Sequence, residues 1–112
     1  MSRLNMFLLF LVFVAVVAPP LAAADLDTAI KRTGKLYFGT ALDRRHLADP
    51  LCESIAHAEF GCITTENSLK WGKTQRMRGN FTVDEAEQVV GWAHGRGKTV
   101  RGHALVWHVG LP

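Results

Sequence analysis

The sequence has no marked excess of charge of one sign. Its 13 basic and 10 acidic residues give a formal net charge of +3 at pH 7, and they are scattered along the chain. A nucleic-acid-binding surface needs clustered lysine and arginine, so nucleic acid is not an expected partner. No internal repeat or low-complexity linker follows residue 24. The chain is long enough for one small core, yet shorter than most domains.

Cysteine is also scarce, with only Cys52 and Cys62 in 112 residues. A helix predicted over residues 50–60 would place Cys62 beyond its far end, more than one helical turn from Cys52. Disulfide-bonded residues have Cα atoms roughly 4.4–6.8 Å apart. We therefore expect no bridge between the two.

Only one long apolar run is present, at residues 6–18, and it follows the positive charge of Arg3. Two prolines break the run, and three alanines then supply a cleavage site between Ala24 and Asp25. This layout is typical of a secretory signal peptide. A membrane anchor is the alternative, but the run falls short of the ~20 residues that a spanning helix needs. We expect a secreted, extracellular chain of residues 25–112, with net charge +2 and no membrane partner.

After residue 24, helix and strand patterns alternate. Apolar spacing and end signals predict helices over 26–33, 50–60 and 83–94, and strands over 35–42, 62–65 and 99–107. Asp49 is expected to cap the second helix, and Thr82 with Glu85 fits a capping box for the third. Strands that alternate with such helices predict an α/β fold with a parallel sheet and right-handed crossovers.

Polar and aromatic side chains follow the predicted strands. Glu66, Asn67, Lys70 and Trp71 come after the second strand. The carboxyl ends of parallel strands are where α/β folds place their sites. A carboxylate, an amide and an ammonium can together bind several hydroxyls of one sugar ring, beside an aromatic face. The alternative is an ordinary polar loop with a core tryptophan.

The third predicted strand carries His103 and Trp107. On a strand these two side chains share one face and could flank one ligand, whereas His108 points to the other face. Two histidines on opposite faces, with no third ligand nearby, make a poor metal site, so no metal is expected. For His103 the alternative is a buried core histidine.

Three phrases, "YFGTAL", "TTENSLKW" and "RGHALVWHVGLP", resemble the amino-terminal part of family-10 glycoside hydrolases, the endo-1,4-β-xylanases. The resemblance implies about the first three strands, with their helices, of an incomplete (β/α)8 TIM barrel. It implies that Glu66, Asn67 and Lys70 bind a xylose on the non-reducing side of the scissile bond. His103 and Trp107 would shape the adjacent sugar site. The implied partner is xylan or a xylo-oligosaccharide, without a cofactor.

This sequence also departs from the family pattern. Thr65 stands where proline is usual, Ser68 and Leu69 replace a glutamate and a methionine, and Ala104 replaces a threonine. Gly110 replaces a glutamine that lines the family's substrate cleft. The sugar contact that this glutamine makes in the family is therefore not expected here.

Retaining glycosidases need two carboxyl groups roughly 5–5.5 Å apart. The resemblance places both catalytic glutamates beyond Pro112. Within the chain, Glu66 is the only carboxylate in a site motif at a strand end, and Asp43 follows the first strand without a motif. We predict that the chain alone is inactive and is a fragment or a truncated product. One alternative is a secreted non-catalytic protein that binds xylan or acts as a decoy for xylanase inhibitors. Another is a plain interaction module.

A glycosylation sequon spans residues 80–82, Asn-Phe-Thr. It predicts N-glycosylation of Asn80 on a surface loop of a secreted protein. The oligomeric state is not predicted by the sequence.

Overall fold

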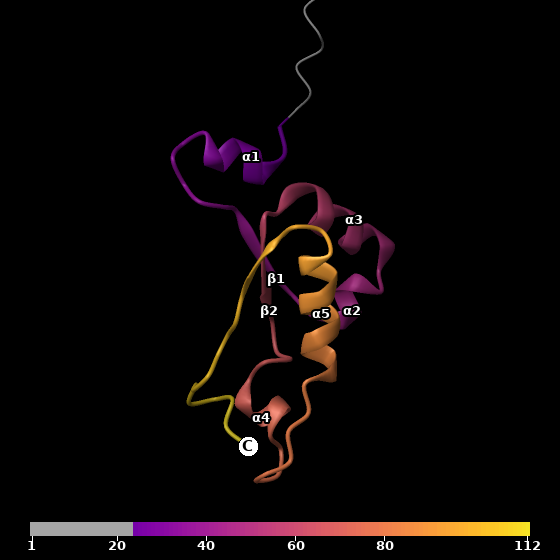
Figure 1. Cartoon of the computed structure of the whole chain (residues 1–112), viewed down its shortest axis with the longest axis vertical. Coiled ribbons are helices and arrows are strands. Elements are labelled where there is room, and N and C mark those ends of the chain that lie inside the picture. Colours follow the sequence, from indigo (N-terminus) through magenta and orange to yellow (C-terminus); the bar gives the residue numbers. More distant parts are fainter. Residues whose placement is uncertain (1–23) are drawn as a thin grey trace, which may run out of the picture.

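A computed structural model describes residues 24–112 (Figure 1). The predicted signal peptide therefore lies outside the described residues, apart from Ala24. Among the described residues, no helix is both long and apolar enough to span a membrane. The elements in chain order are α1 (Leu26–Lys31), β1 (Gly39–Leu42), α2 (Arg44–Leu47), α3 (Pro50–Glu59), β2 (Cys62–Thr65), α4 (Trp71–Thr74), α5 (Asp84–His94) and β3 (Thr99–Arg101).

The three strands form one parallel sheet in the order β1-β2-β3, as predicted. Ile63 in the central strand pairs with Thr40 on one side and Val100 on the other. The α2–α3 pair connects β1 to β2, and α5 lies in the connection from β2 to β3. Figure 1 shows these helices on one side of the sheet, with the C-terminal segment on the other.

The core lies between the sheet and these helices. Its buried side chains are Leu42, Ala56, Ile63, Val89 and Ala93. On α5, Val89 and Ala93 are four residues apart and share one face, which an amphipathic helix turns toward the core. Ile63 and Val89 are fully buried, and α5 packs against the central strand.

The amino-terminal ends of the helices follow the predicted signals at α3 but not at α5. Asp49 accepts hydrogen bonds from the backbone N–H groups of Leu51 (2.9 Å) and Cys52 (3.3 Å), as expected of an N-cap. The capping box predicted for α5 is wrong. The Thr82 hydroxyl instead donates to the Lys73 carbonyl (3.1 Å), so the helix begins later, at Asp84, and tertiary contact replaces the local cap.

Two predicted strands are longer than the observed ones. The strand predicted over 35–42 is only Gly39–Leu42, and the one predicted over 99–107 ends at Arg101. A strand exists only where a neighbour pairs with it, and the central strand β2 offers four residues. Residues beyond that pairing take other conformations, and the peptide bond between His103 and Ala104 is cis.

Both cysteines are free thiols in the structure. Cys52 is exposed on α3, whereas Cys62 is buried in β2. This agrees with the expectation from their spacing.

Candidate functional site

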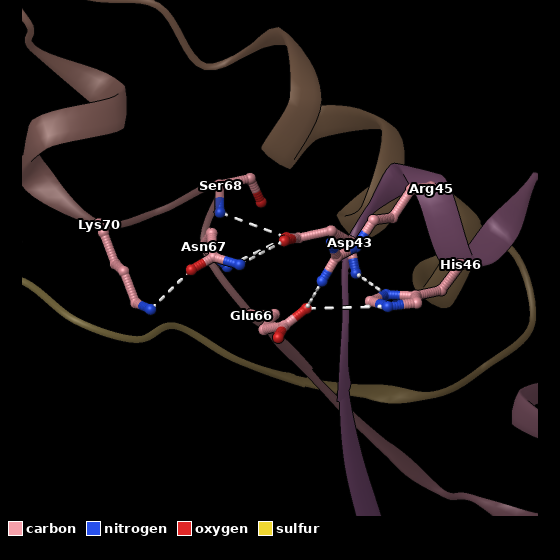
Figure 2. A network of polar contacts seen from close by, with 7 residues as sticks. All are labelled: Asp43, Arg45, His46, Glu66, Asn67, Ser68 and Lys70. Atoms are coloured by element: carbon pink, nitrogen blue, oxygen red, sulfur yellow. Dashed lines mark hydrogen bonds and ion pairs between the residues drawn. The ribbon is translucent and has the colours of Figure 1, made fainter.

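The candidate site is built on the carboxyl ends of β1 and β2. Asp43 directly follows Leu42, and Glu66 directly follows Thr65. The Glu66 N–H donates to the Leu42 carbonyl at 3.1 Å, which continues the strand pairing by one residue and keeps the two loops together. Side chains of these loops therefore meet above the sheet, as Figure 2 shows.

The Asp43 carboxylate is the centre of this network. Its Oδ1 accepts the backbone N–H groups of Asn67 (3.1 Å) and Ser68 (3.3 Å), and its Oδ2 accepts the Asn67 side-chain Nδ2 (2.9 Å). Burial raises the pKa of Asp43, but the hydrogen bonds from Asn67 and Ser68 outweigh it, so the pKa lies below its ordinary value. A charged Asp43 thus ties the two loops together.

Lys70 connects Asn67 to Trp107. The Lys70 ammonium donates to Asn67 Oδ1 at 2.7 Å and lies 4.7 Å from the centroid of the Trp107 ring. An ammonium over an indole face is a favourable cation–π contact. Trp107 is about one-third exposed, so part of its ring remains open to a ligand.

The turn that carries Trp107 is anchored to α4, which begins directly after Lys70. The Gly110 N–H donates to the Trp107 carbonyl at 2.9 Å, and the Gly72 N–H donates to the Gly110 carbonyl at 2.7 Å. A Cβ atom at Gly110 would lie 3.1 Å from Trp107 Cε3. Glycine at this position therefore lets the ring pack closely.

Glu66 is held by two residues of α2. Its Oε2 lies 3.0 Å from Arg45 Nη2 and 3.8 Å from His46 Nε2. His46 Nδ1 accepts the backbone N–H of Asp43 at 2.9 Å. His46 thus contacts both the Asp43 backbone and the Glu66 carboxylate.

His103 lies on the other side of the sheet from the helices. It lines an open cavity of about 530 Å³ together with Tyr37, Thr64, Glu66 and Arg101, among others. The expectation that His103 and Trp107 share a strand face is wrong, because β3 ends at Arg101 and Trp107 belongs to the turn beyond it.

The structure thus brings the expected residues together in two groups. Asn67, Lys70 and Trp107 are in direct contact, and Glu66 shares a cavity with His103. Trp71, which belongs to the same sequence motif, forms a separate contact on α4.

The Trp71 indole N–H donates to Gln75 Oε1 at 2.8 Å.

Among the described residues, no group of three or more His, Cys, Asp or Glu side chains could hold a metal ion.

Sequence reasoning missed the roles of Asp43, Arg45 and His46. Asp43 was set apart because no motif surrounds it, yet it binds the second loop at three points. The available signal was its position, since the polar run "DRRH" directly follows the predicted first strand. Sites of α/β folds lie at the carboxyl ends of parallel strands, and Asp43 follows such an end just as Glu66 does.

Solved structures identify the class of fold. An endo-1,4-beta-xylanase of Penicillium canescens superposes with a TM-score of 0.73 at 33% identity, over 78% of this chain and 27% of that one. A mutant xylanase of Thermoanaerobacterium saccharolyticum in complex with xylotetraose gives 0.72 at 32% identity, over 81% and 28%. The described sheet and helices are the first strand–helix units of a (β/α)8 TIM barrel, in agreement with the prediction.

Sequence relatives then identify the family. The model of glycosyl hydrolase family 10 matches residues 25–112. Endo-1,4-beta-xylanase 3 of Hypocrea jecorina is 43% identical over 91 residues, which cover 81% of this chain and 26% of that protein. Endo-1,4-beta-xylanase B of Humicola insolens is 46% identical over 87 residues, covering 78% and 24%. The chain belongs to glycosyl hydrolase family 10 and spans about a quarter of the length of these curated relatives.

Proposed function

We propose that this chain supplies the sugar-holding part of the substrate cleft of an endo-1,4-β-xylanase. Glu66, Asn67 and Lys70 bind one xylose of xylan or of a xylo-oligosaccharide, and His103 and Trp107 border the next sugar. The observation that carries the proposal is the position of the Lys70 ammonium, 2.7 Å from Asn67 Oδ1 and 4.7 Å from the Trp107 ring centroid.

The chemistry of these groups suits a sugar. A lysine ammonium has three N–H donors, and Asn67 uses one of them, which leaves donors for sugar hydroxyls. The Glu66 carboxylate adds acceptors, and the exposed part of the Trp107 ring offers an apolar face. Family membership and the xylotetraose complex of a similar xylanase support the same substrate class.

We also propose that the chain alone does not hydrolyse xylan. The two carboxylates that follow β1 and β2 are Asp43 and Glu66. Three donors bind Asp43, and its lowered pKa is the opposite of what a general acid needs. Glu66 pairs with Arg45. The retaining pair of glutamates then belongs to later strands of the barrel, and this chain is a fragment or a truncated product of such an enzyme.

Secretion and glycosylation belong to the same proposal. The charge of Arg3, the apolar run at 6–18 and the alanines before Asp25 support an extracellular chain. Asn80 is exposed in a turn where its N–H donates to the Met77 carbonyl at 3.0 Å, so its side chain is accessible to glycosylation.

The test is a titration of the full chain with xylotetraose by calorimetry. Lys70→Ala should weaken binding about tenfold or more, the loss typical of a charged hydrogen bond. Lys73→Ala is the matched control, because Lys73 is an exposed lysine on the neighbouring α4. Equal affinity of all three proteins would contradict the proposed sugar site.

A hybrid protein provides a second test of the same two substitutions. In this hybrid, residues 25–112 replace the matched quarter of the Penicillium canescens xylanase, which gives the sheet its remaining neighbours. Lys70→Ala should there raise KM for xylan, and Lys73→Ala should not.

A further inference from the structure

The hydrogen bonds of Asp43 fix which way the Asn67 amide faces. A carboxylate accepts hydrogen bonds and donates none, so only the NH2 end of Asn67 can face it. Asp43 Oδ2 accepts Asn67 Nδ2 at 2.9 Å. Since Oδ1 of Asn67 is on the opposite arm of the planar amide, it must then point away from Asp43.

That orientation determines where Lys70 can lie. A lysine ammonium only donates, so it needs an acceptor, and Asn67 Oδ1 provides one at 2.7 Å. If the Asn67 amide were reversed, it would present N–H groups to the ammonium, and this contact would be lost. Lys70 would then no longer be held beside the Trp107 ring. Figure 2 shows this row of groups from Asp43 through Asn67 to Lys70.

We infer that Asp43 is a positioning residue for the sugar site, which sets the orientation of the Asn67 amide and thereby the place of the Lys70 ammonium. The inference rests on the proposed function in one respect only: the proposed function identifies the ligand that Asn67 and Lys70 bind as a sugar. The orientation itself depends on the donor and acceptor chemistry of three side chains and can be measured without a sugar.

A second set of contacts makes Asp43 suited to this task. Its Oδ1 accepts the backbone N–H groups of Asn67 and Ser68, and its own N–H donates to His46 Nδ1. The residue is about nine-tenths buried. The backbone of Asp43 is thus tied to α2, and its carboxylate cannot turn away from the Asn67 amide without losing its bonds to Asn67 and Ser68.

The decisive variant is Asp43→Asn in the full chain. The amide oxygen of the new side chain can still accept the two backbone N–H groups, but its NH2 group then faces the NH2 group of Asn67. Because two donors cannot bind each other, the Asn67 amide must reverse its orientation. The ¹H–¹⁵N NMR signals of the Asn67 side-chain amide and of the Lys70 ammonium should shift. Xylotetraose affinity should fall about tenfold or more, as for loss of a charge-assisted hydrogen bond.

A double variant separates orientation from simple loss of stability. In Asp43→Asn with Asn67→Asp, the amide and the carboxylate exchange places. The amide at position 43 donates to the carboxylate at position 67, whose other oxygen accepts the Lys70 ammonium. The Lys70 signal should return toward its original position. In the hybrid, Asp43→Asn should raise KM more than it lowers kcat, and the exchange should reverse part of the rise.

Asp49→Asn is the matched control, because Asp49 also accepts two backbone N–H groups but caps α3. It should leave the Asn67 and Lys70 signals unchanged. The inference is overturned if Asp43→Asn leaves these signals and KM as they are, or if the double variant behaves as the sum of its single changes. If Asp43→Asn reverses the amide while Lys70→Ala leaves xylotetraose affinity intact, the positioning role stands and the proposed function fails.

Discussion

Arg45 Nη2 lies 3.0 Å from Glu66 Oε2, and this contact joins α2 to the loop that follows β2. Both side chains are open to solvent, with about 69% of Arg45 and 38% of Glu66 exposed. An exposed ion pair contributes little to stability, because water and salt screen it. We expect its effect to be geometric instead, through the direction in which Glu66 presents its carboxylate.

Arg45→Met should therefore separate binding from stability. We expect the free energy of unfolding to change by less than about 1 kcal/mol, as for other exposed pairs. Affinity for xylotetraose should fall several-fold, because Glu66 loses its fixed direction. Calorimetry and urea unfolding measure the two quantities, with the exposed neighbour Arg44→Met as control. A large loss of stability without a change in affinity would show that the pair is structural.

The pKa of Asp43 predicts a loss of stability in acid. The pKa in the folded protein is below its ordinary value of 3.8, so the unfolded chain binds the proton more readily. The contribution of Asp43 is therefore present above pH 3.8 and disappears as the pH falls through the lower folded value. Urea unfolding of the hybrid should show a steeper acid loss for the original sequence than for Asp43→Asn. Parallel pH profiles would contradict this.

Lys98 is expected to stabilise the end of α3. Its ammonium donates to the carbonyl oxygens of His57 at 2.8 Å and Phe60 at 2.6 Å. Lys98→Met leaves these carbonyls without that donor and should cost about 1–3 kcal/mol of unfolding free energy. The exposed Lys35→Met serves as control and should cost little. Thermal unfolding of the hybrid measures both, and equal midpoints would show that the contact is not stabilising.

Asn80 should carry a glycan when the full chain passes through a eukaryotic secretory pathway. The expected result is a chain that starts at Asp25 and loses mass on treatment with an N-glycosidase. Asn80→Gln should remove that loss, whereas substitution of Asn67, which is not in a sequon, should not. Retention of the first 24 residues on the secreted chain would contradict the proposed cleavage.

The order of strands and helices could be predicted from the sequence because apolar spacing and the N-cap signal at Asp49 are local. Strand lengths could not, since the four residues of β2 limit how far its neighbours pair. The cap of α5 was mispredicted because Thr82 bonds to Lys73 instead. The role of Asp43 depends on two loops meeting in space, which no local pattern records.

Release of reducing sugar from xylan tests the central claim most directly. On the proposed function, the full chain alone should release none above the blank, because the catalytic pair is proposed to belong to later strands of the barrel. The hybrid should hydrolyse xylan, with a higher KM after Lys70→Ala. Hydrolysis by the full chain alone, or a folded hybrid that is inactive while the Penicillium canescens xylanase is active, would contradict the account.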